Sequence, residues 1–195
     1  MSKKVYIADL THTGNGTMAL TFPLGASYVA SYAKKILGKE FDFKLFKYQD
    51  RLHQAILNEP PQILGLSNYC WNIELGYTLI EWAKSINPNL IVIIGGPNFP
   101  TTADEKIKFL KSRPLVDFNI ESEGELGFVR IIQKLKEHNF NVKSLKQTQE
   151  RVVNCSYLYN DKLVEAKIER IKDVNEIPSP YLTGTLDEFF KLPLI

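Results

Sequence analysis

Two stretches, ILGLSNY (residues 63–69) and LIVIIGGPNFP (residues 90–100), decide the fold that this sequence predicts. In each, an apolar run of strand length passes directly into a polar or glycine-rich turn. Runs that are almost wholly apolar are typical of strands covered on both faces, as in a parallel sheet. The turns would then meet at the carboxyl edge of that sheet, where open α/β folds hold their ligands. We therefore expect the serine turn and the glycine pair to form a cofactor platform.

The rest of the chain up to about residue 140 alternates in the same way between strand and helix patterns. Strands are predicted at residues 4–10, 41–46, 63–66, 90–94 and 116–120, and helices at residues 24–37, 49–57, 73–86 and about 125–138. Strands that alternate with helices favour a parallel sheet with helices on both faces. The prediction for residues 1–140 is therefore an α/β fold, a Rossmann-like (flavodoxin-like) doubly wound sheet of five parallel strands.

The pattern changes after about residue 141. Two alternating runs at residues 151–159 and 163–168 flank the polar turn Asn160-Asp161-Lys162, which predicts a C-terminal β-hairpin within an appended segment at residues 141–176. In IPSPYL (residues 177–182) each proline disfavours the α conformation of the residue before it. We expect residues 177–195 to form an extended linker.

Composition excludes several classes of function. The 195 residues are 44% hydrophobic, and 24 Lys and Arg against 22 Asp and Glu leave a net charge of +2. So balanced a charge gives no case for nucleic acid or an anionic membrane as a partner. The basic start leads into an apolar run broken by Asp9 and His12, so neither a signal peptide nor a membrane span is expected. Two cysteines without metal-binding spacing favour the cytoplasm.

The loop after the first strand, THTGNGT (residues 11–17), is rich in hydroxyl groups and glycine, a composition suited to wrapping a phosphate. Its spacing T-x-T-G-N resembles the flavin-phosphate loop of flavodoxins, so an FMN-binding electron-transfer protein is an alternative. A phosphate loop of that kind normally runs straight into its helix, whereas residues 17–22 intervene here. The candidate cofactor contacts in this loop are Thr11, His12, Thr13, Gly14 and Asn15.

Aromatic side chains gather in the loops after the third and fourth strands. Tyr69, Trp71 and Phe99 could wall a flat ligand from two neighbouring loops. The candidate contacts in these loops are Ser67, Asn68, Tyr69, Trp71, Asn72, Gly95, Gly96, Pro97, Asn98 and Phe99. Cys70 is expected to be a buried small hydrophobe rather than a nucleophile, because no partner base accompanies it.

The fifth strand ends in ESEGE (residues 121–125), at the start of the next helix. Acids at that place complement the helix dipole, which explains Glu125. Glu123, Gly124 and Glu125 could also contact hydroxyl or amide groups of a ligand at the same edge. No nucleophile or metal site accompanies these acids, so we predict no catalytic residue in this chain.

Five motifs, taken in order, resemble those of a known family. FPLGA (22–26), PQILGLSNYCWN (61–72), IVIIGGPNFP (91–100), VDFNIESEGE (116–125) and IPSPYLTG (177–184) resemble the N-terminal half of cobalamin-dependent radical SAM enzymes. The resemblance implies a Rossmann-like cobalamin-binding domain, commonly without a protein histidine on cobalt. It also implies that the nucleotide tail of cobalamin passes Ser67, Gly95 and Gly96. The corrin ring would lie over the loops at residues 12–15, 69–72 and 98–99.

Two positions depart from the pattern of related cobalamin domains. His12 is a candidate cobalt ligand, but Asp9, His12 and Gly14 are spaced D-x-x-H-x-G, whereas domains with a lower histidine ligand have D-x-H-x-x-G. Tyr69 stands where leucine usually follows the serine. The spacing at His12 fits a cobalamin domain without a protein histidine on cobalt, and the departure at Tyr69 bears on how the nucleotide tail fits there.

The resemblance also implies a second domain. Radical SAM domains carry C-x-x-x-C-x-x-C for a 4Fe-4S cluster, which Cys70 and Cys155 cannot supply. The cluster and S-adenosylmethionine are therefore expected in a radical SAM domain absent from this sequence, present in cis or in trans, with methyl transfer as the implied reaction. The side chains expected to be exposed and to dock on that domain are Tyr181, Leu186, Phe189 and Phe190.

Overall fold

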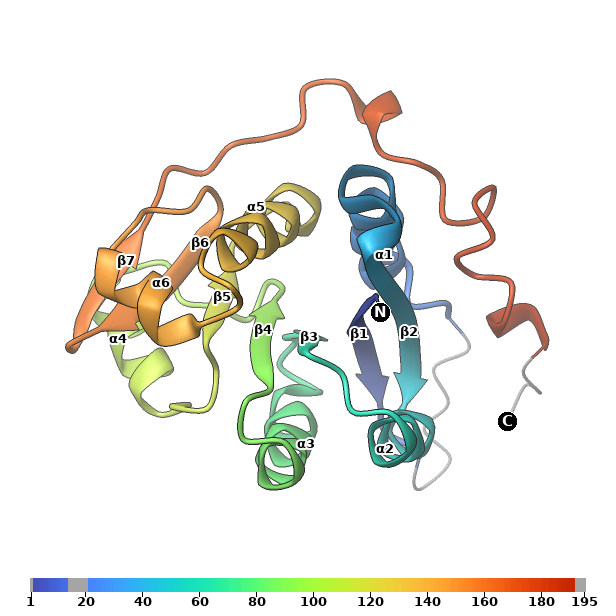
Figure 1. The fold of residues 1–195 in the computed structure, drawn as a ribbon, viewed down its shortest axis with the longest axis horizontal. Coiled ribbons are helices and arrows are strands. Elements are labelled where there is room, and N and C mark those ends of the chain that lie inside the picture. Colours follow the sequence, from blue (N-terminus) through green and yellow to red (C-terminus); the bar gives the residue numbers. More distant parts are fainter. Residues whose placement is uncertain (1, 14–20, 192–195) are drawn as a thin grey trace.

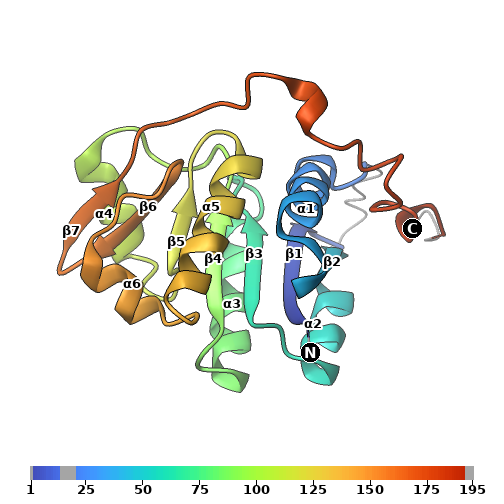
Figure 2. The same ribbon diagram turned by 45° about the horizontal axis from the view of Figure 1, so that its top comes forward.

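The computed structural model describes residues 2–13 and 21–191 and shows an α/β fold built on one mixed sheet (Figures 1 and 2). Within these residues, seven strands lie in the order β2-β1-β3-β4-β5-β6-β7. They are β1 (Lys3–Thr11), β2 (Phe41–Tyr48), β3 (Ile63–Ser67), β4 (Ile91–Gly95), β5 (Phe118–Ile120), β6 (Cys155–Tyr159) and β7 (Lys162–Glu165). The first five strands are parallel, which confirms the Rossmann-like prediction.

Helices cover both faces of the sheet (Figure 2). They are α1 (Leu24–Leu37), α2 (Gln49–Asn58), α3 (Ile73–Ile86), α4 (Ala103–Lys111), α5 (Gly124–Glu137) and α6 (Val142–Thr148). Side chains of α1, α5 and α6 join the core on one face, and those of α2 and α3 join the core on the other. In the part of the chain that the structure describes, no helix is both long and apolar enough to cross a lipid bilayer.

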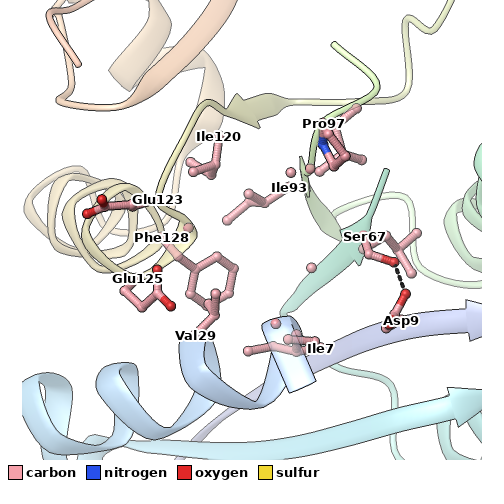
Figure 3. Close-up of a pocket in the computed structure, with 18 of the residues that line it drawn as sticks. Ile7, Asp9, Val29, Ser67, Ile93, Pro97, Ile120, Glu123, Glu125 and Phe128 are labelled. Atoms are coloured by element: carbon pink, nitrogen blue, oxygen red, sulfur yellow. Dashed lines mark hydrogen bonds between the residues drawn. The ribbon is translucent and has the colours of Figure 1, made fainter. Parts of the chain in front are cut away.

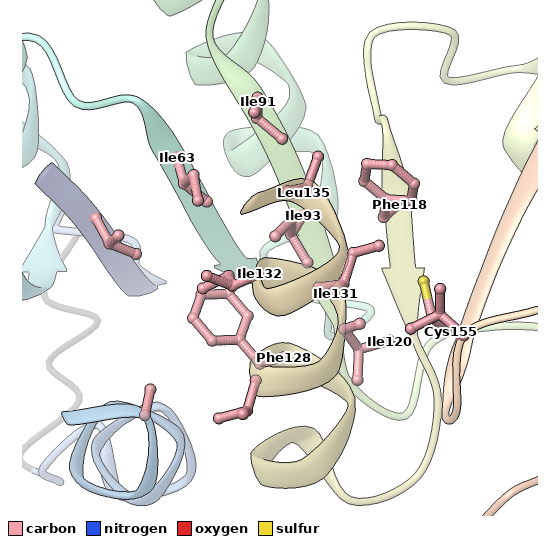
Figure 4. Close-up of a cluster of buried hydrophobic side chains, with 14 of the residues drawn as sticks. Ile63, Ile91, Ile93, Phe118, Ile120, Phe128, Ile131, Ile132, Leu135 and Cys155 are labelled. Atoms are coloured by element: carbon pink, nitrogen blue, oxygen red, sulfur yellow. The ribbon is translucent and has the colours of Figure 1, made fainter. Parts of the chain in front are cut away.

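The apolar stripe of α5 explains how this helix is held. Its buried side chains Phe128, Ile131, Ile132 and Leu135 follow helical spacing and face the sheet. Figure 4 shows them against isoleucines of β3, β4 and β5. Because the central strands are covered by helices on both faces, their sequences are continuously apolar instead of alternating.

The order of the strands reverses between β1 and β3. The chain passes from β1 outward to β2, then returns to form β3 on the other side of β1. In register, Ser67 pairs with Gly95, so the carboxyl ends of β3 and β4 lie level, while Ala8 pairs with Leu66 and β1 continues beyond them to Thr11. A topological switch point at level strand ends is where such a fold opens a crevice for a ligand.

The sheet has two more strands than the five predicted. The hairpin extends the edge of this sheet, because β6 pairs antiparallel with β5 through Cys155 opposite Ile120. The predicted hairpin itself is confirmed, with shorter strands. Its two turn residues, Asn160 at φ 48° and Asp161 at φ 62°, have the positive φ that a type I′ turn requires.

Two helices, α4 and α6, have no counterpart in the sequence prediction. α4 buries only Lys106 and Leu110, and α6 buries only Leu145. Short helices with so few buried side chains give little apolar periodicity. A local signal was present for α6, since the Asn141 side chain caps it by accepting a hydrogen bond of 2.9 Å from the Ser144 amide.

The segment after β7 crosses the domain and continues along α1 (Figure 1). It forms no regular helix at residues 177–182, as predicted. The prediction that Leu186 is exposed is wrong, because this side chain is fully buried against the domain. Phe189 is partly buried, whereas Tyr181 and Phe190 are 44% and 60% exposed. The Phe190 ring lies 4.8 Å from that of Phe22, so part of the expected docking surface packs on its own chain.

Candidate functional site

A cavity of about 430 Å³ opens at the carboxyl edge of the sheet, between the strands and helices α1 and α5 (Figure 3). The strands contribute Ile7, Gly65, Ile93, Gly95 and Ile120 to its wall. The helices contribute Gly25, Ala26, Val29, Gly124, Glu125 and Phe128. Its size is within the range of small-molecule sites, and its wall is mainly apolar. We call this cavity the groove.

Glycines allow the walls of the groove to approach one another closely. A Cβ atom at Gly124 would lie 2.8 Å from Cγ2 of Val29, so only glycine lets α5 begin so near α1. At Gly65 a Cβ would lie 3.0 Å from the Phe128 ring. Gly25 differs, because nothing lies within 4 Å of the position that a Cβ there would occupy. The helix wall is therefore narrow at Gly124 and open at Gly25.

The turn after β4 requires glycine for a second reason. Gly96 has φ 139°, which side-chain-bearing residues rarely adopt, and a Cβ there would lie 2.6 Å from the Asn68 carbonyl oxygen. The Asn68 amide donates to the Gly95 carbonyl at 2.7 Å. The loops after β3 and β4 are thus in backbone contact at the mouth of the groove.

Two asparagines fix these loops further. Asn68 is fully buried, and its Nδ2 donates to the Asn98 carbonyl at 3.0 Å. In return, Nδ2 of Asn98 donates to Oδ1 of Asn68 at 3.2 Å. Both residues therefore position the loops, and neither lines the groove.

Ser67 and Asp9 join the ends of β3 and β1. The Ser67 hydroxyl donates to Oδ1 of Asp9 at 2.6 Å, and Nδ2 of Asn72 donates to the Ser67 hydroxyl at 3.0 Å. Asn72 also accepts the Tyr69 amide at 2.9 Å. Burial, together with the Asp9 carboxylate, raises the pKa of the Tyr69 hydroxyl, which keeps it protonated at the mouth.

His12 lies at the rim and contacts the loop after β3. Its Nε2 is 2.8 Å from the Trp71 carbonyl oxygen, and since a carbonyl only accepts, Nε2 carries the proton. Only Nδ1 is left with a lone pair for a metal. Trp71 is 60% exposed and stacks on Tyr69, with ring centroids 4.4 Å apart. Among residues 2–13 and 21–191, no group of three His, Cys, Asp or Glu side chains is arranged for a metal ion.

The three glutamates of residues 121–125 have different roles. Glu121 accepts from Lys106 Nζ at 2.7 Å and from the Ser156 hydroxyl, which ties α4 and β6 to the end of β5. Glu123 accepts the Ile171 amide at 3.0 Å and faces away from the apolar wall (Figure 3). Glu125 lines the groove beside Phe128 and Val29, and burial raises the pKa of its carboxyl group.

Part of the predicted site meets at the groove. The predicted residues that line it are Ser67, Tyr69, Gly95, Gly96, Pro97, Glu123, Gly124 and Glu125. Others occupy the surrounding loops without lining it, namely Thr11, His12, Thr13, Asn68, Trp71, Asn72, Asn98 and Phe99. Gly14 and Asn15 lie outside the described residues.

Sequence reasoning missed the helix wall and the floor of the groove. The lining residues not predicted include Ile7, Asp9, Gly25, Ala26, Val29, Gly65, Ile120 and Phe128. The pair Gly25-Ala26, small residues in the first turn of a helix after Pro23, was the available signal. The prediction that Cys70 is buried is wrong, since it is exposed at the rim. Cys155 is the buried cysteine, and burial raises the pKa of its thiol.

Fold and groove together define an α/β domain with a mainly apolar groove at the carboxyl edge of its sheet, the edge at which open α/β folds bind ligands. The family model for the B12 binding domain matches residues 18–132, and the chain belongs to that family. The resemblance found from the motifs is thereby confirmed, and the FMN-binding alternative is not favoured.

Similar proteins are much longer than this chain. The 2-(S-pantetheinyl)-carbapenam-3-carboxylate methyltransferase of Streptantibioticus cattleyicolor is 29% identical over 192 residues, 95% of this chain and 26% of that protein. The cobalamin-dependent radical SAM methyltransferase TokK of Streptomyces tokunonensis is 30% identical over 174 residues, 85% of this chain and 24% of that protein. The structure of the cobalamin-dependent S-adenosylmethionine radical enzyme OxsB with aqua-cobalamin and S-adenosylmethionine bound matches with a TM-score of 0.67 at 19% identity, over 96% of this chain and 25% of that one. This chain thus spans about a quarter of each.

Proposed function

We propose that this chain binds cobalamin with the nucleotide tail in the groove and the corrin ring over the surrounding loops. The observation that carries this proposal is the groove itself, an apolar slot at the switch point with glycines along both walls. The residues present fit the tail, because a heteroaromatic base needs a narrow apolar space and close approach to backbone. Bound cobalamin would supply a cobalt centre that carries a methyl group or changes its oxidation state.

The chain's own residues hold the edges of this slot. The Ser67–Asp9 hydrogen bond fixes the ends of β3 and β1, and the paired asparagines fix the loops on which the ring would rest. The stacked rings of Tyr69 and Trp71 offer a flat apolar surface at the mouth. These residues bind and orient the cofactor, and none of them performs a covalent step.

The chemistry itself belongs to a partner. We propose that a radical SAM domain, in cis or in trans, uses the bound cobalamin in a methyl transfer, with its own 4Fe-4S cluster and S-adenosylmethionine. Support comes from the similar proteins described above, two of which are named methyltransferases. The two cysteines of this chain are insufficient to ligate such a cluster. The surface proposed to face that domain is formed by Tyr181, Leu182 and Phe190, exposed apolar side chains within residues 177–191.

Equilibrium dialysis of the chain against methylcobalamin, cobinamide and FMN tests the proposed function. Cobinamide has the corrin ring but no nucleotide tail. We expect retention of methylcobalamin, weaker retention of cobinamide and no retention of FMN. Retention of FMN alone would replace the proposal with the flavin alternative, and equal retention of the two corrinoids would show that the groove does not hold the tail.

A further inference from the structure

Glu125 stands out among the polar side chains that line the groove. Within residues 2–13 and 21–191, the hydrogen-bond partner of its carboxyl group is its own backbone amide, and no other side chain pairs with it. It lies three residues before Phe128, so both side chains are on one face of α5 (Figure 3). The Phe128 ring covers Gly65 at the floor, and Glu125 lines the same groove.

Two of the other polar side chains of the groove, Ser67 and Glu123, already have hydrogen-bond partners. The Ser67 hydroxyl gives its single proton to Asp9 and accepts from Asn72, so it has no proton left for a ligand. The Glu123 carboxylate accepts the Ile171 amide and lies 3.9 Å from Arg170. Of the groups named, Glu125 is therefore the one with a carboxyl group available to a bound molecule.

The surroundings of Glu125 favour its protonated form. Burial is the main cause that raises the pKa of this carboxyl group, and the negative charge of Glu123 adds to it. The α1 side of the groove is made of Gly25, Ala26 and Val29, which carry no charge, and the charged group contributed by β1 is Asp9, an acid. A carboxyl group in this setting retains its proton more readily than an exposed one and can act as a hydrogen-bond donor.

A cobalamin tail that enters the groove brings an acceptor with it. When the benzimidazole base leaves cobalt, its ring nitrogen has an unshared electron pair, and a buried acceptor without a partner costs about 1–3 kcal/mol. Resting on the proposed function, we propose that Glu125 is a specificity-determining residue whose carboxyl group donates its proton in a hydrogen bond to the ring nitrogen of the tail base. The groove thereby distinguishes cobamides with a nitrogenous base from those with a phenolic tail.

Two cobamides and two variants test this inference. Methylcobalamin and methyl-p-cresolylcobamide share the corrin ring, phosphate and ribose, but the cresol tail has no ring nitrogen. Dissociation constants of both are measured for the wild-type chain, E125M and E125Q, with folding checked by circular dichroism. E125M removes the hydrogen-bond donor at a nearly constant side-chain length, and E125Q retains an N–H donor. E125A replaces E125M if the latter fails to fold.

The ratio of effects on the two cobamides decides the outcome. We expect E125M to weaken methylcobalamin binding by about 5- to 100-fold, to change cresolylcobamide binding by less than about 2-fold, and E125Q to restore most of the loss. Equally weakened binding of both cobamides would overturn the inference, because the carboxyl group would then contact a part of the molecule that the two cobamides share. An unchanged affinity for methylcobalamin would also overturn it. Failure of the wild-type chain to bind either cobamide would instead refute the proposed function.

Discussion

Replacing Gly25 by leucine should make the protein more stable and yet abolish tight cobalamin binding. Gly25 is exposed in the first turn of α1 at the groove, and four residues later Val29 lines the same wall. No atom lies within 4 Å of the position of an added Cβ, so a side chain enters open space. Replacing a helical glycine is worth about 0.5 kcal/mol or more of stability. The leucine side chain, however, occupies space that the tail needs.

The expected loss of affinity follows from the area that the tail base can no longer bury. A base the size of an aromatic side chain buries about 150–250 Å², which at about 25 cal/mol per Å² is about 4–6 kcal/mol. Exclusion of the base therefore raises Kd for methylcobalamin by about three to four orders of magnitude. Isothermal titration calorimetry measures the affinity, and urea denaturation measures the stability.

Gly25→Ala is the matched control for this substitution. Its methyl group meets nothing within 4 Å, so it should raise stability and leave the affinity within about 3-fold of the wild-type value. A G25L variant that is folded and binds methylcobalamin as tightly as the wild-type chain would refute the placement of the tail in the groove.

Substitutions at three further positions test the residues in and around the groove. Gly96→Ala should cost about 2–3 kcal/mol in urea denaturation, since it forces a positive φ and a contact of 2.6 Å with Asn68; an unchanged midpoint would contradict this. Lys106→Met should cost about 3 kcal/mol by the same assay, because the largely buried Glu121 carboxylate then loses its positively charged partner. Lys106→Arg keeps the positive charge and should cost less. Glu125→Gln should stabilise the cofactor-free chain increasingly as pH rises from about 4, near the usual pKa of a glutamate, through the raised pKa of the folded carboxyl group. The pKa of this carboxyl group is raised in the folded state, which therefore binds more protons than the unfolded state, and wild-type stability falls across that range. A stability difference between the variant and the wild type that does not change with pH would contradict the raised pKa.

The central sheet could be predicted because its physical signals are local. Continuous apolar runs such as residues 63–66 and 90–94 occur where helices cover both faces of a strand. The pairing of Cys155 with Ile120 could not be predicted from the sequence, because a hairpin pattern does not indicate which edge of a sheet the hairpin will join. Burial of Leu186 was missed for a related reason, since whether an apolar side chain covers its own domain or another depends on the path of the whole segment.

The candidate site was predictable where it is formed by strand ends and not where it is formed by packing. Ser67 and Gly95 follow apolar strands, so the topology alone brings them to one edge. The α1 wall depends on the close approach of α1 to α5 at Gly124, which is a tertiary contact. The different roles of Glu123 and Glu125 depend on the Ile171 amide, which lies far along the chain.

The visible spectrum of methylcobalamin mixed with the wild-type chain tests most directly whether the groove holds the tail. The absorption of this cofactor moves to shorter wavelength when its own base leaves cobalt. If the tail enters between the sheet and helices α1 and α5, the bound cofactor must show this base-off spectrum at neutral pH. Binding with an unchanged base-on spectrum would contradict the proposed mode of binding, because the base would then remain on cobalt and outside the groove.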